Sequence, residues 1–298
     1  MTDVQMNRIR MERRRRRAKQ RRIRKLLQFS FYFGVVVILL SVGGIGIKWL
    51  AEMDGNDVSI DRVKTAFGKS RSSDISQMTH EEIRQTDMWK SVFENRELYP
   101  DVMLETLEKN PEIVEFVKNY PDAQPVAAGG FSAREREQQY PLFLQWDARW
   151  GYVPYGDDNV GLSGCGPACL SMVIFSLTGN ENATPDVIAE FSENNGYYVY
   201  GEGTSWSLMT DAAAYYGVKT EELSLGEGNM KGYLDGGGMI ICSMGPGDFT
   251  SSGHFIVIYG YDQDGFLVND PFSRIRSSRS WSYDTISGQI RSMWGYIY

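Results

Sequence analysis

The sequence predicts an α+β fold behind an N-terminal membrane-spanning segment, and three observations support this prediction. An uninterrupted apolar run occupies residues 26–47. Helical patterns dominate from residue 79 to residue 234, and a cysteine begins the most apolar of them. Runs typical of β-strands dominate from residue 239 to the end of the chain. Helices and strands that follow one another in separate blocks favour an α+β layout over an alternating one.

Length and composition fit one or two domains with a proper hydrophobic core. The chain has 298 residues, of which 42% are hydrophobic. Its net charge of −7 conceals a basic arm at residues 1–25, where ten Arg and two Lys outweigh two acidic residues. The arm has a net charge of +10, which leaves −17 for the remaining chain. So acidic a body argues against nucleic acid as a partner.

Residues 26–47 predict a transmembrane helix that anchors the protein. The run holds 22 residues without a charge, and about 20 apolar residues span a bilayer. Positive charge on the N-terminal flank keeps that end in the cytoplasm. A cleaved signal peptide is the alternative, but the run is longer than a usual signal core and lacks a clear small-x-small cleavage site. We expect a single-pass signal anchor in the cell membrane, with an extracytoplasmic body.

The region between the anchor and the strands contains a second, smaller unit. Residues 48–78 are polar and predict a linker. Thr79 and Glu82 have the spacing of a capping box, and two short helices that open with proline follow. The expected order is a helical module at residues 79–120, a linker at residues 121–139 and a larger domain at residues 140–298. A spacer and a substrate-docking module both fit the helical module.

Within the larger domain the sequence predicts helices first and strands afterwards. The expected helices begin at Cys165, at Thr184-Pro185 and at Gly203-Thr204-Ser205, and a short one covers residues 229–234. β-branched and aromatic runs predict strands at residues 239–243, 255–261, 266–268 and 294–298.

Cys165 stands where a glycine-rich run meets the apolar helix. Pro167 suits the first turn of a helix and not its interior. Backbone N–H groups and the helix dipole favour negative charge at a helix start, so a thiol there loses its proton more easily. The alternative is a small buried residue in a tight turn. Cys169, one turn into the helix, is a second candidate nucleophile. Cys169 and Cys242 lie in apolar runs and are expected to be buried thiols, with a bridge between them as the alternative.

Three further residues supply the other parts of a thiol-based catalytic set. His254 begins a β-branched run that predicts a buried strand, and Asp270 ends the next such run. An imidazole base and a carboxylate that orients it complete a triad with a thiolate, and the upstream amide of Gln145 can donate to an oxyanion. Asn269 is the alternative orienting residue, but strand alternation points Asn269 and Asp270 to opposite faces.

Four short stretches, taken in order, resemble one family of peptidases: Gln145, Gly164-Cys165-Gly166-Pro167-Ala168, Gly253-His254-Phe255 and Asn269-Asp270-Pro271. The family is that of the bacteriocin-processing (double-glycine) cysteine peptidases, in its stand-alone C-thirty-nine-like branch. The resemblance covers roughly residues 140–298 and implies a papain-like fold with a Cys/His/Asp triad and an upstream Gln. Such chemistry needs no metal and no organic cofactor.

Two departures limit what the resemblance implies. The gap between Gln145 and Cys165 is longer than in the transporter-fused relatives. No Walker-type loop follows either, so the export-coupled role of those relatives does not carry over.

The sequence therefore predicts a membrane-anchored, extracytoplasmic cysteine peptidase of bacterial type that acts on a peptide or protein substrate. Two alternatives stay open. The same triad could catalyse acyl transfer to an amine or amide cleavage in cell-wall peptides. The domain could also be a non-catalytic peptide- or wall-binding protein on a peptidase scaffold. The substrate and the oligomeric state do not follow from the sequence.

Overall fold

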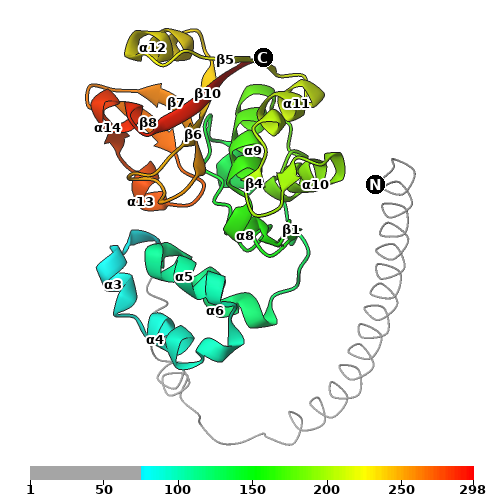
Figure 1. Cartoon of the computed structure of the whole chain (residues 1–298), viewed down its shortest axis with the longest axis vertical. Coiled ribbons are helices and arrows are strands. Elements are labelled where there is room, and N and C mark those ends of the chain that lie inside the picture. The colour runs from blue at the N-terminus through cyan, green and yellow to red at the C-terminus, as the bar shows by residue number, and fades with distance from the viewer. Residues whose placement is uncertain (1–74) are drawn as a thin grey trace, which may run out of the picture. The chain divides into compact units, whose positions relative to one another are not determined.

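A computed structural model describes residues 75–298 (Figure 1). The predicted basic arm, the predicted anchor at residues 26–47 and nearly all of the predicted linker lie outside the described residues. Between residue 75 and residue 298, no helix is both long enough and apolar enough to cross a membrane.

The predicted helices between the linkers are present as a group of short helices. They are α3 (His80–Arg84), α4 (Asp87–Glu94), α5 (Asp101–Lys109) and α6 (Val114–Asn119), with 3₁₀ turns at Ile75–Gln77, Arg96–Leu98, Pro111–Ile113 and Tyr120–Asp122. The predicted capping box exists, because the Thr79 hydroxyl accepts from the backbone N–H of Glu82 while the Glu82 carboxylate accepts from that of Thr79.

The core of this helical module continues into the next part of the chain. Its buried residues, such as Leu107 and Ile113, belong to one cluster with Leu144 and Trp146. Phe116 also stacks on Tyr152, with 4.5 Å between ring centroids. The predicted linker between the two regions holds a short helix, α7 (Ala133–Arg136). The division of the chain at residues 121–139 into two separate units stays a prediction. The helical module shares buried residues with the larger domain.

A six-stranded antiparallel sheet forms the second half of the domain, as the α+β prediction requires. Its order is β5-β10-β6-β7-β8-β9. The strands are β5 (Lys219–Glu222), β6 (Met239–Met244), β7 (His254–Tyr261), β8 (Phe266–Asn269), β9 (Ser280–Trp281) and β10 (Ile290–Ile297). The four predicted strands are β6, β7, β8 and β10. The edge strands β5 and β9 were not predicted: β5 consists of charged and polar residues, and β9 has only two residues.

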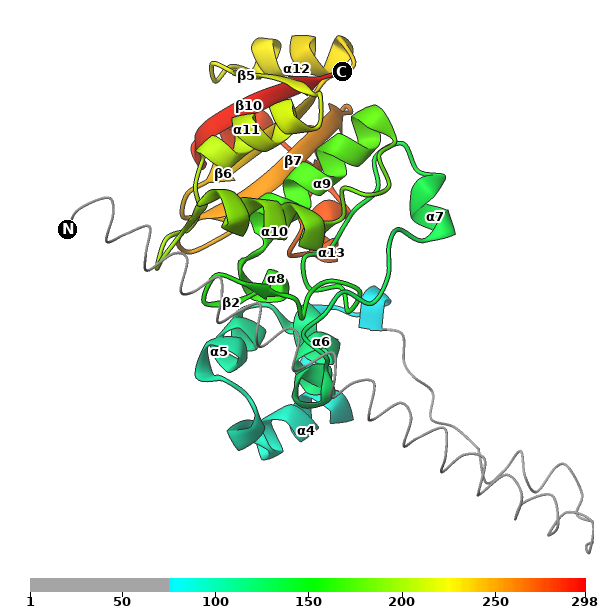
Figure 2. The ribbon, with the colours of Figure 1, turned by 90° about the vertical axis from the view of Figure 1, so that its right-hand side faces the viewer.

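The helix that begins at Cys165, α9 (Cys165–Thr178), packs on β7 (Figure 2). Gly166 to Phe175 are all buried, which fits a helix that is apolar on every side. The other helices are α8 (Val160–Ser163), α10 (Pro185–Asn195), α11 (Ser207–Tyr215), α12 (Glu227–Asp235), α13 (Arg274–Ser277) and α14 (Tyr283–Ser287).

One predicted helix start is wrong. Gly203-Thr204-Ser205 does not open α11, because Gly203–Thr204 forms strand β4 and pairs with β3 (Tyr198–Val199). A similar two-residue hairpin, β1 (Pro154–Tyr155) with β2 (Asp158–Asn159), precedes α8.

Candidate active site

The turn between α8 and α9 places Cys165 at the first position of α9, with a half-exposed side chain. The turn depends on the glycines on either side of the cysteine. A Cβ on Gly164 would lie 2.4 Å from the carbonyl oxygen of Val160, and a Cβ on Gly166 would lie 2.9 Å from Cγ2 of Thr204. Larger residues would push the chain apart at both positions, which explains why small residues flank the thiol.

His254, the first residue of β7, lies between Asp270 and Cys165. Its Nε2 is 2.8 Å from Oδ1 of Asp270, and the Cys165 thiol is close enough to raise the pKa of the imidazole. Because Nε2 is taken by the carboxylate, Nδ1 is the nitrogen left for the sulfur. Burial lowers the pKa of His254, but Asp270 and then Cys165 outweigh it and raise that pKa to about 9. The imidazole therefore carries its second proton at neutral pH.

Asp270 follows β8 and is fully buried. Its Oδ1 also accepts from the backbone N–H of Phe272 at 2.8 Å, and its Oδ2 accepts from Nε of Arg276 at 2.5 Å. Burial raises the pKa of Asp270, but the opposite charges of His254 and Arg276 lower it overall. The side chain is thus an ionised carboxylate shared by two cations. Arg276 was not predicted from the sequence, because nothing in its neighbourhood marks it beyond its nearness to Asp270.

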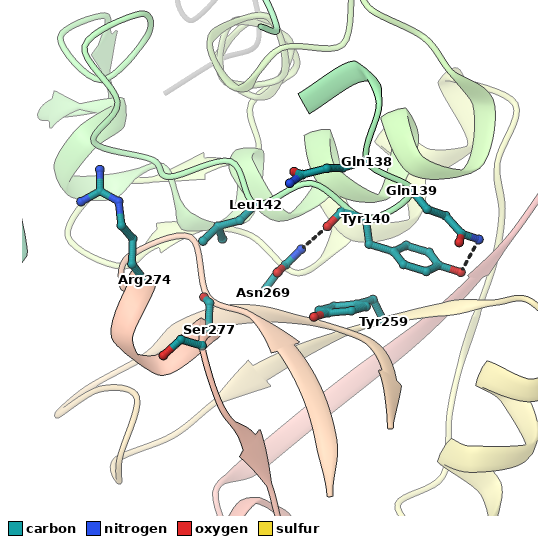
Figure 3. A pocket seen from close by; sticks show the side chains of 9 residues that line it. Gln138, Gln139, Tyr140, Leu142, Tyr259, Asn269, Arg274 and Ser277 are labelled. Atoms are coloured by element: carbon teal, nitrogen blue, oxygen red, sulfur yellow. Dashed lines mark hydrogen bonds between the residues drawn. The ribbon is translucent and has the colours of Figure 1, made fainter. Parts of the chain in front are cut away.

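Asn269, the alternative orienting residue, points away from the imidazole. Its amide donates to the carbonyl oxygens of Tyr140 and Pro141, at 3.2 Å and 3.1 Å. Figure 3 shows the Asn269 side chain directed at Tyr140. Asn269 therefore secures the chain segment that leads to Gln145, while Asp270 on the opposite face contacts His254.

A pocket of about 490 Å³ lies on the Asn269 side of the strand (Figure 3). Tyr140, Tyr259 and Arg274 are among the residues that line it. None of Cys165, His254 and Asp270 lines this pocket. It is therefore separate from the group of side chains that could react.

Gln145 lies between the two chain segments that carry the cysteine and the aspartate. Its amide Nε2 donates to the carbonyl oxygen of Gly161 at 3.0 Å, and its backbone N–H donates to that of Pro271 at 2.8 Å. The side chain is buried, and its Oε1 has no hydrogen-bond partner. The structure thus brings Gln145 to the turn before Cys165 despite the long gap in sequence. Its role towards an oxyanion stays a prediction.

The other two cysteines are poorly placed for chemistry. Cys169 and Cys242 are fully buried, and all three cysteines are free, so the alternative of a bridge between Cys169 and Cys242 is wrong for this structure. Burial raises the pKa of both thiols well above the ordinary range. Neither thiol can easily form the reactive thiolate.

Geometry and charge together fit nucleophilic catalysis by a thiol. A half-exposed sulfur, a protonated imidazole and a buried carboxylate lie next to one another, and the imidazole is hydrogen-bonded to the carboxylate. Within residues 75–298, no three His, Cys, Asp or Glu side chains are close enough to hold a metal ion.

The chain belongs to the Peptidase_C39 like family, whose profile matches residues 137–298. No curated protein matches the chain. The peptidase domain of Streptococcus ComA, a bi-functional ABC transporter involved in a quorum sensing pathway, is similar at 19% identity over 47% of this chain and 93% of that domain, with a TM-score of 0.36. A putative C39-like peptidase from Bacillus anthracis is similar at 16% identity over 57% of this chain and 98% of that chain, with a TM-score of 0.33.

The predicted family is therefore confirmed, and with it the α+β peptidase domain. Family membership supports a function of the cysteine peptidase type and a peptide or protein as substrate.

Proposed function

We propose that the protein is a cysteine peptidase that hydrolyses peptide bonds through Cys165, His254 and Asp270. The observation that supports this proposal most directly is the position of His254: its Nε2 lies 2.8 Å from Oδ1 of Asp270, and the Cys165 thiol is close enough to raise the pKa of the imidazole. A non-catalytic scaffold has no need for an imidazole that is buried, charged and paired with the one half-exposed thiol.

The reaction would follow the course of thiol peptidases. The thiolate of Cys165 attacks the carbonyl carbon, and the resulting oxyanion accepts from the backbone N–H of Cys165 and from the Gln145 amide. The imidazolium of His254 gives its proton to the departing amine as the peptide bond breaks, which leaves a thioester. The neutral imidazole then takes a proton from water, which attacks the thioester and releases the acid.

The direct test is to incubate the full-length protein in detergent with a peptide library and to identify new termini by mass spectrometry. Hydrolysis at defined bonds is the expected result. Incorporation of an added amine in place of water would assign the triad to acyl transfer instead. An absence of both products would point to a binding protein.

Gln145→Ala is expected to lower kcat by roughly 10²–10³-fold, the usual effect of losing one oxyanion donor. Alkylation of Cys165 should stay at the wild-type rate, because the side-chain hydrogen bond of Gln145 goes to the carbonyl oxygen of Gly161. Gln138→Ala, which changes an exposed glutamine upstream, is the matched control. An unchanged kcat in Gln145→Ala would show that the side chain serves only as a hydrogen-bond donor to the carbonyl oxygen of Gly161 and does not bind the oxyanion.

The proposal extends to the location of the enzyme: residues 26–47 anchor it, and residues 48–298 lie outside the cytoplasm. It is supported by the length of the apolar run and by the basic arm before it. Protease added to intact cells is expected to digest the body and to leave an epitope tag on residues 1–25 protected. Permeabilised cells are the control, in which the tag is lost. A tag that is digested in intact cells would contradict this orientation.

A further inference from the structure

Glu112 is a buried carboxylate of the helical module, far in sequence from the proposed triad. Only 3% of it is exposed. One of its oxygens accepts from the hydroxyl of Ser273 and lies 3.6 Å from Nε2 of His80, and the other oxygen accepts from the backbone N–H of Arg274 at 2.7 Å. A buried carboxylate is costly unless such donors surround it. Simple packing between the module and the domain does not require one.

A series of hydrogen bonds connects Glu112 to Asp270 through Ser273 and Arg276. Ser273 is the N-cap of α13, where its hydroxyl oxygen accepts from the backbone N–H of Arg276 at 3.1 Å. Arg276 in turn holds the carboxylate of Asp270. The loop between them has a second attachment to the module, since the Asn110 amide donates to the carbonyl oxygen of Phe272 at 2.6 Å.

We propose that Glu112 is a positioning residue, which acts through Ser273 and Arg276 to hold the Asp270 carboxylate against His254. The inference rests on the proposed function and deepens it. It gives the helical module a definite role: it completes the support of the catalytic carboxylate instead of serving only as a spacer or a docking platform.

The geometry distinguishes this role from plain stabilisation. α13 has four residues, too few to be stable alone, so the direction of the Arg276 side chain depends on how the start of α13 is held. Glu112 holds that start with both of its oxygens. Loss of Glu112 should therefore change the charge state of the site, not only the stability of the protein.

The experiment compares Glu112→Ala, Ser273→Ala and the double variant by the pH dependence of Cys165 alkylation in the full chain. At pH 7, Glu112→Ala should react roughly tenfold more slowly than the wild type, because a misplaced carboxylate no longer keeps the imidazole charged. Because the two residues act in one chain of contacts, the double variant should be no slower than the slower single variant. On a cleaved peptide, kcat should fall while KM stays, since Glu112 is not expected to touch the substrate.

Glu105→Gln is the matched control, because it changes an exposed carboxylate of the same module. It should leave the alkylation profile as in the wild type. If Glu112→Ala does not fold, Glu112→Gln replaces it: this variant keeps one acceptor and should show a smaller slowing in the same direction.

Two outcomes overturn the inference, and they can be told apart. A folded Glu112 variant with the wild-type pH profile, in a protein whose alkylation does depend on His254, overturns the inference alone. If His254→Ala alone leaves the pH profile of Cys165 alkylation unchanged, the proposed function is overturned. The inference about Glu112 is then overturned as well.

Discussion

Replacement of Cys165 by alanine is expected to abolish peptide hydrolysis, with a loss in kcat of roughly 10⁵–10⁶-fold, as for removal of other covalent nucleophiles. Cys165 is the one cysteine that combines exposure with contact to an imidazole. The other thiols are fully buried and hard to ionise. The measurement is kcat on a peptide identified from the library.

Cys169→Ala is the matched control for this prediction. It removes a buried thiol one turn further along the same helix, so it should reduce stability slightly and leave kcat within a few-fold of the wild type. Mass mapping after brief treatment with iodoacetamide should find the label on Cys165 alone. Hydrolysis that survives in Cys165→Ala but is lost in Cys169→Ala would reassign the nucleophile.

The second large effect concerns pH. Between pH 6 and pH 8, alkylation of Cys165 is expected to be faster in the wild type than in His254→Ala. The pKa of His254 is raised to about 9. Its charge is therefore present below that pH and lost as the pH rises through it. A positive imidazole beside the sulfur favours the thiolate, and the variant lacks this help.

The ratio of the two alkylation rates gives a quantitative check. The variant lacks the positive charge beside the sulfur, so at pH 6.5 it should be slower by at least roughly tenfold, even though a stabilised thiolate is a weaker nucleophile. Near pH 10 the rates should converge, because the imidazole of the wild type is then neutral. Glu105→Gln, which changes an exposed carboxylate of the helical module, is the control. Parallel pH profiles of alkylation for the wild type and His254→Ala would contradict a role of the His254 imidazole in activating Cys165.

The sequence predicts most of the site because its signals are local. Gly164 and Pro167 mark a helix start around Cys165, and the alternation of a strand separates Asp270 from Asn269. The structure places each of these residues as the local rules require. It also places Asp270, not Asn269, against His254.

The supporting contacts could not be predicted in the same way. Glu112 and Ser273 are 161 positions apart, and no periodic pattern links them. The Arg276 side chain reaches Asp270 only because α13 folds back after Pro271, a turn that the sequence does not specify. Strand β5 escaped prediction because its residues are mostly exposed and charged, so it lacks the apolar alternation that marks a strand.

The two outer strands of the sheet bear on how the protein behaves when many copies are crowded together. An open strand edge can recruit strands from other molecules and so template aggregates. Strand β5 carries Lys219, Glu221 and Glu222, and charged side chains of this kind keep an edge strand hydrated; β9 offers only two residues for pairing. Sheet-mediated polymerisation is thus disfavoured at both edges. The peptidase domain should therefore stay dispersed even at high protein concentration.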